Sequence, residues 1–102
     1  MVARLTRYRI RPGKIDEFAG NIESLMSALD KLQGFRVFLM LEGEDPAGRE
    51  ATSISVWESA EQMTSSENSK FYYDVIKTVM GCCESFSPMH HHEVMKIKFA
   101  NG

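Results

Sequence analysis

Hydrophobic and polar residues recur with two different periods along this chain, and the first third contains one example of each. Residues 2–10 mix β-branched, aromatic and arginine side chains without a turn signal, which predicts a strand that ends at Arg11-Pro12-Gly13. From residue 15 to residue 32, apolar residues recur at steps of three and four, which predicts a helix. Gly34 stands where a left-handed C-terminal cap is expected.

The middle of the chain has the pattern of two strands joined by an exposed turn. Residues 35–41 are apolar except for Arg36, which suits a strand that is largely covered on both faces. Residues 42–49 are rich in charge, glycine and proline, and they predict a solvated hairpin connection. In residues 52–57, apolar and small polar side chains alternate, which is the pattern of a strand with one apolar face.

A second helical region begins after Ser59, which with a glutamine three residues on resembles a capping box. The middle of this region is rich in serine and threonine, and Asn68 or Ser69 could cap a fresh helix. We therefore expect a kink or a break there. The helix should end near Gly81, and residues 94–99 predict the last strand.

The order strand-helix-strand-strand-helix-strand predicts a ferredoxin-like α+β fold, with four antiparallel strands and both helices on one face of the sheet. At 102 residues, we expect a single domain that spans residues 1–102. The other face of the sheet is then uncovered, and Val37, Leu39 and Leu41 or their alternates would lie on it. So much exposed apolar area predicts a partner, and a two-fold homodimer with two sheets back to back is the simplest one.

Charge and hydropathy remove several kinds of partner from consideration. Twelve basic and fourteen acidic residues are scattered along the chain, and a formal net charge of −2 offers no basic patch for nucleic acid or an anionic membrane. No apolar run approaches the ~20 residues that cross a bilayer, and no hydrophobic segment opens the chain, so we expect a cytoplasmic protein. Cys82 and Cys83 are adjacent and cannot join distant segments; we expect two small buried residues, with a vicinal redox or soft-metal pair as the alternative.

Several short motifs follow one another in an order that resembles a known family. They are Arg9-Ile10-Arg11-Pro12-Gly13-Lys14, Glu17-Phe18, Gly34-Phe35 and Val56-Trp57-Glu58-Ser59. In this order the chain resembles the antibiotic biosynthesis monooxygenase (ABM) family of dimeric α/β-barrel proteins. The resemblance implies a homodimer with a pocket in each subunit between the sheet and the helices. It also implies that some members oxygenate quinol-like aromatics without a metal or flavin, so we expect no cofactor.

Related members of this family open and oxidise haem with an asparagine, a tryptophan and a histidine. Thr6, Ser66 and Ile76 occupy the corresponding positions in this sequence. The quinol-oxidising members tend to carry histidines near the positions of Ser66 and Phe71. The resemblance therefore implies the fold more directly than it implies either activity.

Aromatic residues could line a pocket between the sheet and the helices. Trp57 ends the third strand beside the second helix, where its ring could form a wall and its indole N–H could orient a ligand oxygen. The alternative is that Trp57 only anchors the core. Tyr8, Phe71 and Tyr72 could extend the aromatic lining of a substrate-binding site, although Phe71 and Tyr72 at helical spacing also suit a plain core.

Arginines of the first strand are candidates for chemistry. Arg7 and Arg9 point to the same side of the strand, where Ser53, Ser55 or Trp57 of a neighbouring strand could lie near them. Such a cluster could bind a carboxylate or an enolate. The alternative is ion pairing with acidic residues of a partner subunit.

Three consecutive histidines form the remaining candidate group. His90 and His92 would share one face of an extended segment and could chelate a metal or shuttle protons near neutral pH. Glu93, the nearest possible further ligand, alternates to the opposite face, so we expect no metal site. A solvated or hydrogen-bonded segment is the alternative.

These candidates support one leading hypothesis and two alternatives. The leading hypothesis is a cofactor-independent monooxygenase for a small aromatic or quinol bound near Trp57, Tyr72 and His92, with Arg9 or His92 assisting deprotonation. The first alternative is a non-catalytic dimeric module of the same fold that holds a small apolar ligand or has a stress-associated role. The second is a haem-binding protein that uses His90 or His92.

Overall fold

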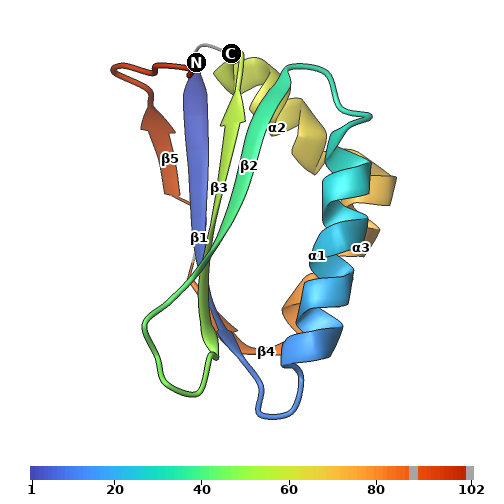
Figure 1. Cartoon of the computed structure of the whole chain (residues 1–102). Helices are drawn as coiled ribbons and strands as arrows, with labels where there is room; N and C mark the ends of the chain where they lie inside the picture. Colours follow the sequence, from blue (N-terminus) through green and yellow to red (C-terminus); the bar gives the residue numbers. More distant parts are fainter. Residues whose placement is uncertain (88–89, 101–102) are drawn as a thin grey trace.

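The computed structural model describes residues 1–87 and 90–100. Its elements in chain order are β1 (Val2–Ile10), α1 (Ile15–Leu29), β2 (Phe35–Glu42), β3 (Glu50–Trp57), α2 (Ala60–Glu67), α3 (Lys70–Gly81), β4 (Cys83–Phe86) and β5 (His90–Glu93). The strands form one antiparallel sheet, and the helices lie together on one side of it (Figure 1). The predicted ferredoxin-like α+β fold is confirmed.

The sheet has the order β2-β3-β1, and both β4 and β5 pair with the free side of β1. β4 pairs with the C-terminal half of β1, through Tyr8, Arg9 and Ile10. β5 pairs with its N-terminal half, from Val2 to Leu5. The two short strands together therefore occupy the place of the fourth strand.

The prediction of a last strand over residues 94–99 is wrong. Residues 94–100 have no regular structure, and the strand pairing lies earlier, in β4 and β5. The length of β1 explains the difference. β5 runs antiparallel to β1 from Leu5 to Val2, and the N–H of Val94 bonds the carbonyl of Met1 at 3.0 Å, so the residues that follow lie beyond the first residue of β1. An alternating pattern makes a strand only where a neighbouring strand offers backbone partners.

The expected break in the second helical region is confirmed. α2 ends at Glu67, and α3 begins at Lys70 with Ser69 as its N-cap. The Ser69 hydroxyl accepts a hydrogen bond from the backbone N–H of Tyr72 at 3.3 Å, and the Ser59 hydroxyl caps α2 in the same way. Each helix therefore begins at its own serine.

The core lies between the helices and the side of the sheet that they cover, which we call the inner face. α1 contributes Phe18, Ile22, Leu25 and Leu29, all buried. Trp57, at the end of β3, is fully buried, and the edge of the Phe35 ring packs against it at a centroid distance of 5.6 Å. These contacts fix the helices over the sheet.

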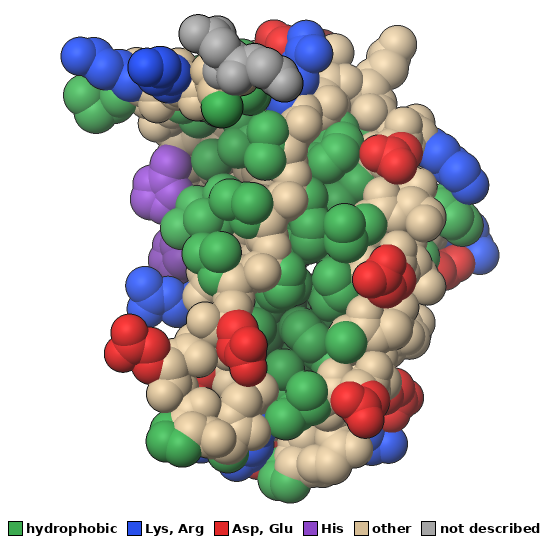
Figure 2. All heavy atoms as spheres, in the orientation of Figure 1, with side chains coloured by type: hydrophobic (Ala, Val, Ile, Leu, Met, Phe, Trp, Pro, Cys, Tyr) green, Lys and Arg blue, Asp and Glu red, His purple; other side chains and the backbone are tan. Residues whose placement is uncertain are grey.

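The opposite side of the sheet, which we call the outer face, has no covering helix (Figure 1). Leu39 and Leu41 of β2 are 48% and 46% exposed, as the sequence predicts. The prediction that both faces of this strand are covered is not met by the chain alone, since β2 is an edge strand with one open face. Figure 2 looks onto that edge, where hydrophobic side chains also gather between β2 and α1 around a groove of about 320 Å³.

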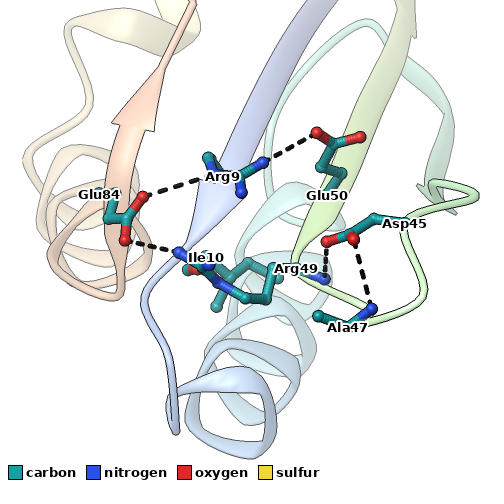
Figure 3. A network of polar contacts seen from close by, with 7 residues as sticks. All are labelled: Arg9, Ile10, Asp45, Ala47, Arg49, Glu50 and Glu84. Atoms are coloured by element: carbon teal, nitrogen blue, oxygen red, sulfur yellow. Dashed lines mark hydrogen bonds and ion pairs between the residues drawn. The ribbon is translucent and has the colours of Figure 1, made fainter.

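The hairpin between β2 and β3 is a solvated turn, as predicted. The Asp45 carboxylate accepts hydrogen bonds from the backbone N–H groups of Ala47 and Arg49 (Figure 3). Gly48 has a φ of +69°, a left-handed conformation that glycine adopts without strain. Among the described residues, no helix is long and apolar enough to cross a membrane.

Candidate functional site

Polar side chains line the inner face of the sheet where aliphatic side chains would be expected. Alternation along β1 directs Arg4, Thr6 and Tyr8 inward, and β3 directs Ser53 and Ser55 to the same side. The strand register places Arg4 opposite Ser55 and Thr6 opposite Ser53. All five residues are buried. The sheet therefore presents a band of polar groups to the interior of the molecule.

Arg4 lies at the centre of this band, and its side chain is only 3% exposed. Its guanidinium donates to the Tyr72 hydroxyl and to Oε1 of Glu67, each at 2.8 Å. The guanidinium carbon also lies 5.5 Å from the ring centre of Trp57 and 5.6 Å from that of Tyr72. A buried guanidinium is costly without partners, and these four contacts together compensate its burial.

The remaining polar groups of the band are paired within the chain. The hydroxyls of Tyr8 and Ser53 lie 3.0 Å apart, and the indole N–H of Trp57 donates to the Ser55 hydroxyl at 3.0 Å. Among the described residues, no buried side-chain nitrogen or oxygen lacks a hydrogen-bond partner. We call these hydrogen-bonded residues, together with Arg4 and Tyr72, the buried network.

Burial raises the pKa of both Tyr8 and Tyr72 above the ordinary phenol value of 10.0. Hydrogen bonding to Ser53 opposes this effect for Tyr8, and the positive charge of Arg4 opposes it for Tyr72. Both phenols are therefore protonated at neutral pH. Each can donate a hydrogen bond to a negatively charged oxygen.

A cavity of about 20 Å³ lies within this network, between the polar band and the residues Leu25, Ile76 and Met80. By size it suits about one water molecule. On the outer side of α3, a mainly apolar groove of about 190 Å³ opens to solvent, beside Glu67 and Lys77. Tyr72, Ile76 and Met80 line both spaces. A single layer of α3 side chains thus separates the buried network from the outside.

Three of the four aromatic residues predicted to line a pocket come together here. Tyr8, Tyr72 and Trp57 all belong to the buried network. Phe71, the fourth, is 52% exposed, and its ring lies 4.7 Å from the Lys31 ammonium. α3 turns Tyr72 inward, so the residue before it faces away from the cavity.

Arg9 lies far from Trp57 in the strand register and points to the opposite face. Its guanidinium forms ion pairs with Glu50 at 2.9 Å and Glu84 at 3.4 Å (Figure 3). The expected proximity of Arg7 and Arg9 to Ser53, Ser55 or Trp57 is not found. Those three residues face inward, and the arginine that shares their side is Arg4.

The histidines of β5 divide between the two faces of the sheet. His90 and His92 pair with Leu5 and Ala3, so they share the outer face and lie away from Trp57 and Tyr72. His91 pairs with Arg4 on the inner side, and its Nε2 lies 3.8 Å from Oε1 of Glu67. In the described part of the chain, no group of three histidine, cysteine, aspartate or glutamate residues is arranged to hold a metal ion.

Cys82 and Cys83 are buried free thiols at the end of α3, as expected. Sequence reasoning missed Arg4, Glu67 and His91, which join the network to the surface. The alternation in β1 contained a signal for Arg4, because Arg4 and Tyr8 occupy positions of the same parity. No local pattern marked Glu67, since its partners lie 63 and 24 residues away along the chain.

The described residues form a ferredoxin-like α+β protein with a buried polar network between sheet and helices. A family model described as antibiotic biosynthesis monooxygenase matches residues 1–78, and the chain belongs to this family. No curated protein matches the sequence.

Solved structures share the fold at low sequence identity. SnoaB, a cofactor-independent oxygenase from Streptomyces nogalater, has a TM-score of 0.82 at 11% identity, with 94% of each chain covered. A conserved protein from Methanosarcina mazei has a TM-score of 0.80 at 13% identity and 89% coverage of both chains. Rv0793 from Mycobacterium tuberculosis has a TM-score of 0.73 at 17% identity and 98% coverage of both.

Proposed function

We propose that this protein is a cofactor-independent monooxygenase that acts on a small aromatic or quinol-type substrate at the buried network around Arg4. The observation that carries the proposal is the position of Arg4, fully enclosed between the rings of Trp57 and Tyr72. A flat substrate would find aromatic walls and a positive charge in the same place. The family and the oxygenase activity of SnoaB support the same function.

The chemistry would rely on the electron-rich substrate itself. Loss of a proton from an acidic ring carbon or hydroxyl gives an anion whose charge rests largely on oxygen, and Arg4 would stabilise that oxygen. Electrons then pass from the anion to O₂, and a substrate CH₂ group plus O₂ gives a C=O group plus water. The substrate loses four electrons and O₂ accepts four, so the reaction is balanced. The protonated Tyr8 and Tyr72 would donate hydrogen bonds to the same oxygen.

A substrate needs more room than the cavity of about 20 Å³ provides. The proposal therefore requires the α3 layer of Ile76 and Met80 to move, which would join the cavity to the outer groove. Methionine is unbranched and adapts easily to such changes. α2 and α3 are separate helices, each with its own N-cap serine. The start of α3 could therefore shift without unwinding α2.

Oxygen uptake over a panel of quinols, hydroxynaphthoquinones and anthrones tests this function. We expect turnover with at least one compound, with formation of the ketone or quinone, and a loss of about 100-fold or more in Trp57→Ala and Arg4→Gln. Phe71→Ala is the matched control, because Phe71 is an aromatic residue of α3 that lies outside the cavity, and it should retain activity. The absence of uptake with every compound would contradict the oxygenase proposal.

We also propose that two copies pack their outer faces together into a homodimeric barrel. Leu39 and Leu41 are half-exposed, and Ile54 pairs with Leu39 on the same face. Burial of this surface would contribute stability that a chain of this size needs. The homodimer would leave the inner face of each subunit available for its own ligand.

One observation favours a second candidate function, a non-catalytic module that binds a small apolar ligand. Ser66 and Phe71 stand near the positions where quinol-oxidising members of the family tend to carry histidines, so this chain lacks those side chains. If this candidate is correct, members of the same compound panel would raise the melting temperature without oxygen uptake or product formation. Product formation by the wild-type protein would exclude it.

A further inference from the structure

We propose that the buried site selects negatively charged aromatic ligands, whose oxygen replaces the Glu67 carboxylate on Arg4 while Glu67 passes to His91. This inference rests on the proposed function for the location of the site, and it adds the charge of the ligand and the means by which the site opens.

The guanidinium of Arg4 has five N–H groups, and its bonds to Glu67 and to the Tyr72 hydroxyl use one on each terminal nitrogen. The rings of Trp57 and Tyr72 lie close to it. Glu67 and Tyr72 both line the groove beside α3, so a ligand oxygen that enters from the groove reaches Arg4 at the positions that these two partners hold.

Glu67 is the partner that can leave. Its side chain is 37% exposed, whereas Tyr72 is 6% exposed and is held in α3. Glu67 is also the last residue of α2, where the negative end of the helix dipole disfavours a carboxylate. The next two residues form the break between the helices, so the end of α2 can turn without unfolding a continuous helix.

A second basic side chain already lies within reach of Glu67. Nε2 of His91 is 3.8 Å from the same oxygen that Arg4 binds, and His91 is half-exposed in β5. Glu67 therefore has a partner at the surface when it leaves the interior. Lys77 lines the outer groove beside Glu67 and would attract an anion to it.

The charge of the ligand follows from the burial of Arg4. A neutral ligand that displaced Glu67 would leave a buried guanidinium without a counter-charge, which is strongly unfavourable. An anion replaces one carboxylate-type contact with another, so the network keeps its charge balance. Carboxylates and ionised phenols or enols have the required oxygen.

Two ligands of the same shape separate charge from size. They are naphthalene-2-carboxylate and its neutral amide, titrated calorimetrically into the full chain at neutral pH. We expect the carboxylate to bind at least about tenfold more tightly than the amide. Trp57 is the only tryptophan, so a single indole N–H signal in the NMR spectrum shows whether the ligand reaches the interior. We expect the carboxylate to shift that signal.

Variants of α2 and β1 test the exchange itself. Glu67→Gln removes the competing charge and should strengthen carboxylate binding several-fold, with little effect on the amide. Glu61→Gln is the matched control, because it makes the same charge change on the same helix outside this network, and it should leave both affinities unchanged. Arg4→Gln should reduce the preference for the carboxylate to near one, and Arg4→Lys, which keeps the charge, should preserve part of it.

Several results would overturn the inference. These are equal affinities of the wild type for the two ligands, binding of neither at millimolar concentration, binding that leaves the indole signal unmoved, and weaker carboxylate binding in Glu67→Gln. None of these measurements needs turnover. A carboxylate preference without any oxygen uptake would contradict the proposed oxygenase activity and leave this inference standing. Turnover of neutral compounds alone would support the oxygenase activity and contradict this inference.

Discussion

The two faces of the sheet differ in where they place polar and apolar side chains. The inner face buries an arginine, two serines and a threonine beneath the helices, whereas the outer face exposes Leu39 and Leu41. A sheet that served only to fold the chain would place its aliphatic residues inside and its polar residues outside. This difference is the basis of both proposals, a ligand at the inner face and a second copy of the chain at the outer face.

The faces also differ in how their charges are neutralised. On the inner face, Arg4 is held by one half-exposed carboxylate and by neutral aromatic groups. At the far end of β1, Arg9 of the outer face lies between two exposed carboxylates (Figure 3). Exposed ion pairs of the second kind contribute little to stability. We therefore expect the partners of Arg4 to contribute more to stability than the partners of Arg9.

The largest effect is expected from Trp57→Ala, which removes the aromatic wall of the inner face. The loss of a fully buried indole should lower the free energy of unfolding by about 3–5 kcal/mol. Urea denaturation measures this loss. Phe71→Ala, at an exposed position, should cost less than about 1 kcal/mol. Equal effects of the two substitutions would remove the distinction between the buried ring of Trp57 and the exposed ring of Phe71.

Dimerisation through the outer face should be weakened by an introduced charge. Leu39→Arg places a cation in the proposed dimer interface and should raise the dimer dissociation constant at least about tenfold, as measured by sedimentation equilibrium. Met26→Arg makes the same change at a half-exposed position on α1 and should leave association unchanged. A wild-type protein that remains monomeric at high concentration would contradict the proposed role of the outer face.

A smaller effect is expected from Tyr72→Phe on the inner face. The substitution keeps the ring and removes the hydroxyl that accepts from Arg4, so the free energy of unfolding should fall by about 1–3 kcal/mol. Tyr73→Phe is the control, because Tyr73 is exposed. If both variants matched the wild type in thermal and urea unfolding, the Arg4 to Tyr72 hydrogen bond would contribute nothing to the network.

The smallest effect concerns Cys83, at the end of the core. Burial raises the pKa of its thiol from 9.0 to about 11. Between these values the unfolded chain ionises while the folded chain keeps its proton, so stability is lost as pH rises through this window. The loss from this group should reach about 1 kcal/mol near pH 10.

Unfolding curves between pH 8 and pH 11 measure the effect of Cys83. Cys83→Ala should flatten the dependence on pH relative to Cys82→Ala, since the second variant keeps the Cys83 thiol. Two parallel profiles would show that the Cys83 thiol does not titrate differently in the folded and unfolded chains.

The local features of this chain were predictable from its sequence. Periodicity indicated α1, the three long strands and the open outer face. The break before α3 was predictable because Ser69 can cap a helix by its own hydroxyl, a property of one residue and its near neighbours. Trp57, Tyr8, Phe71 and Tyr72 were candidates because each is a large aromatic residue that could line a pocket, and the structure places three of them inside and Phe71 outside.

The residues that complete the candidate site were not predictable in this way. Arg4 and Arg9 are both arginines of one strand, and the sequence favoured Arg9 because the position of Trp57 relative to β1 was unknown. Glu67 and His91 meet Arg4 only after three separate elements come together. The predicted strand at residues 94–99 failed for a similar reason. β5 already pairs with the first residues of β1, and residues 94–99 lie beyond them.

The sequence by itself determined the helices and the three long strands, which residues of a strand share a side, and that one side of the sheet would stay open. Hydrogen-bond caps and side-chain period act over a few residues, so they are encoded locally. Only the tertiary structure decided the register of β1 against β3 and β5, and with it that Arg4 is enclosed and Arg9 is not. Register depends on the packing of whole faces, and a shift of one residue would have turned Arg4 to the outer face and Arg9 to the inner face.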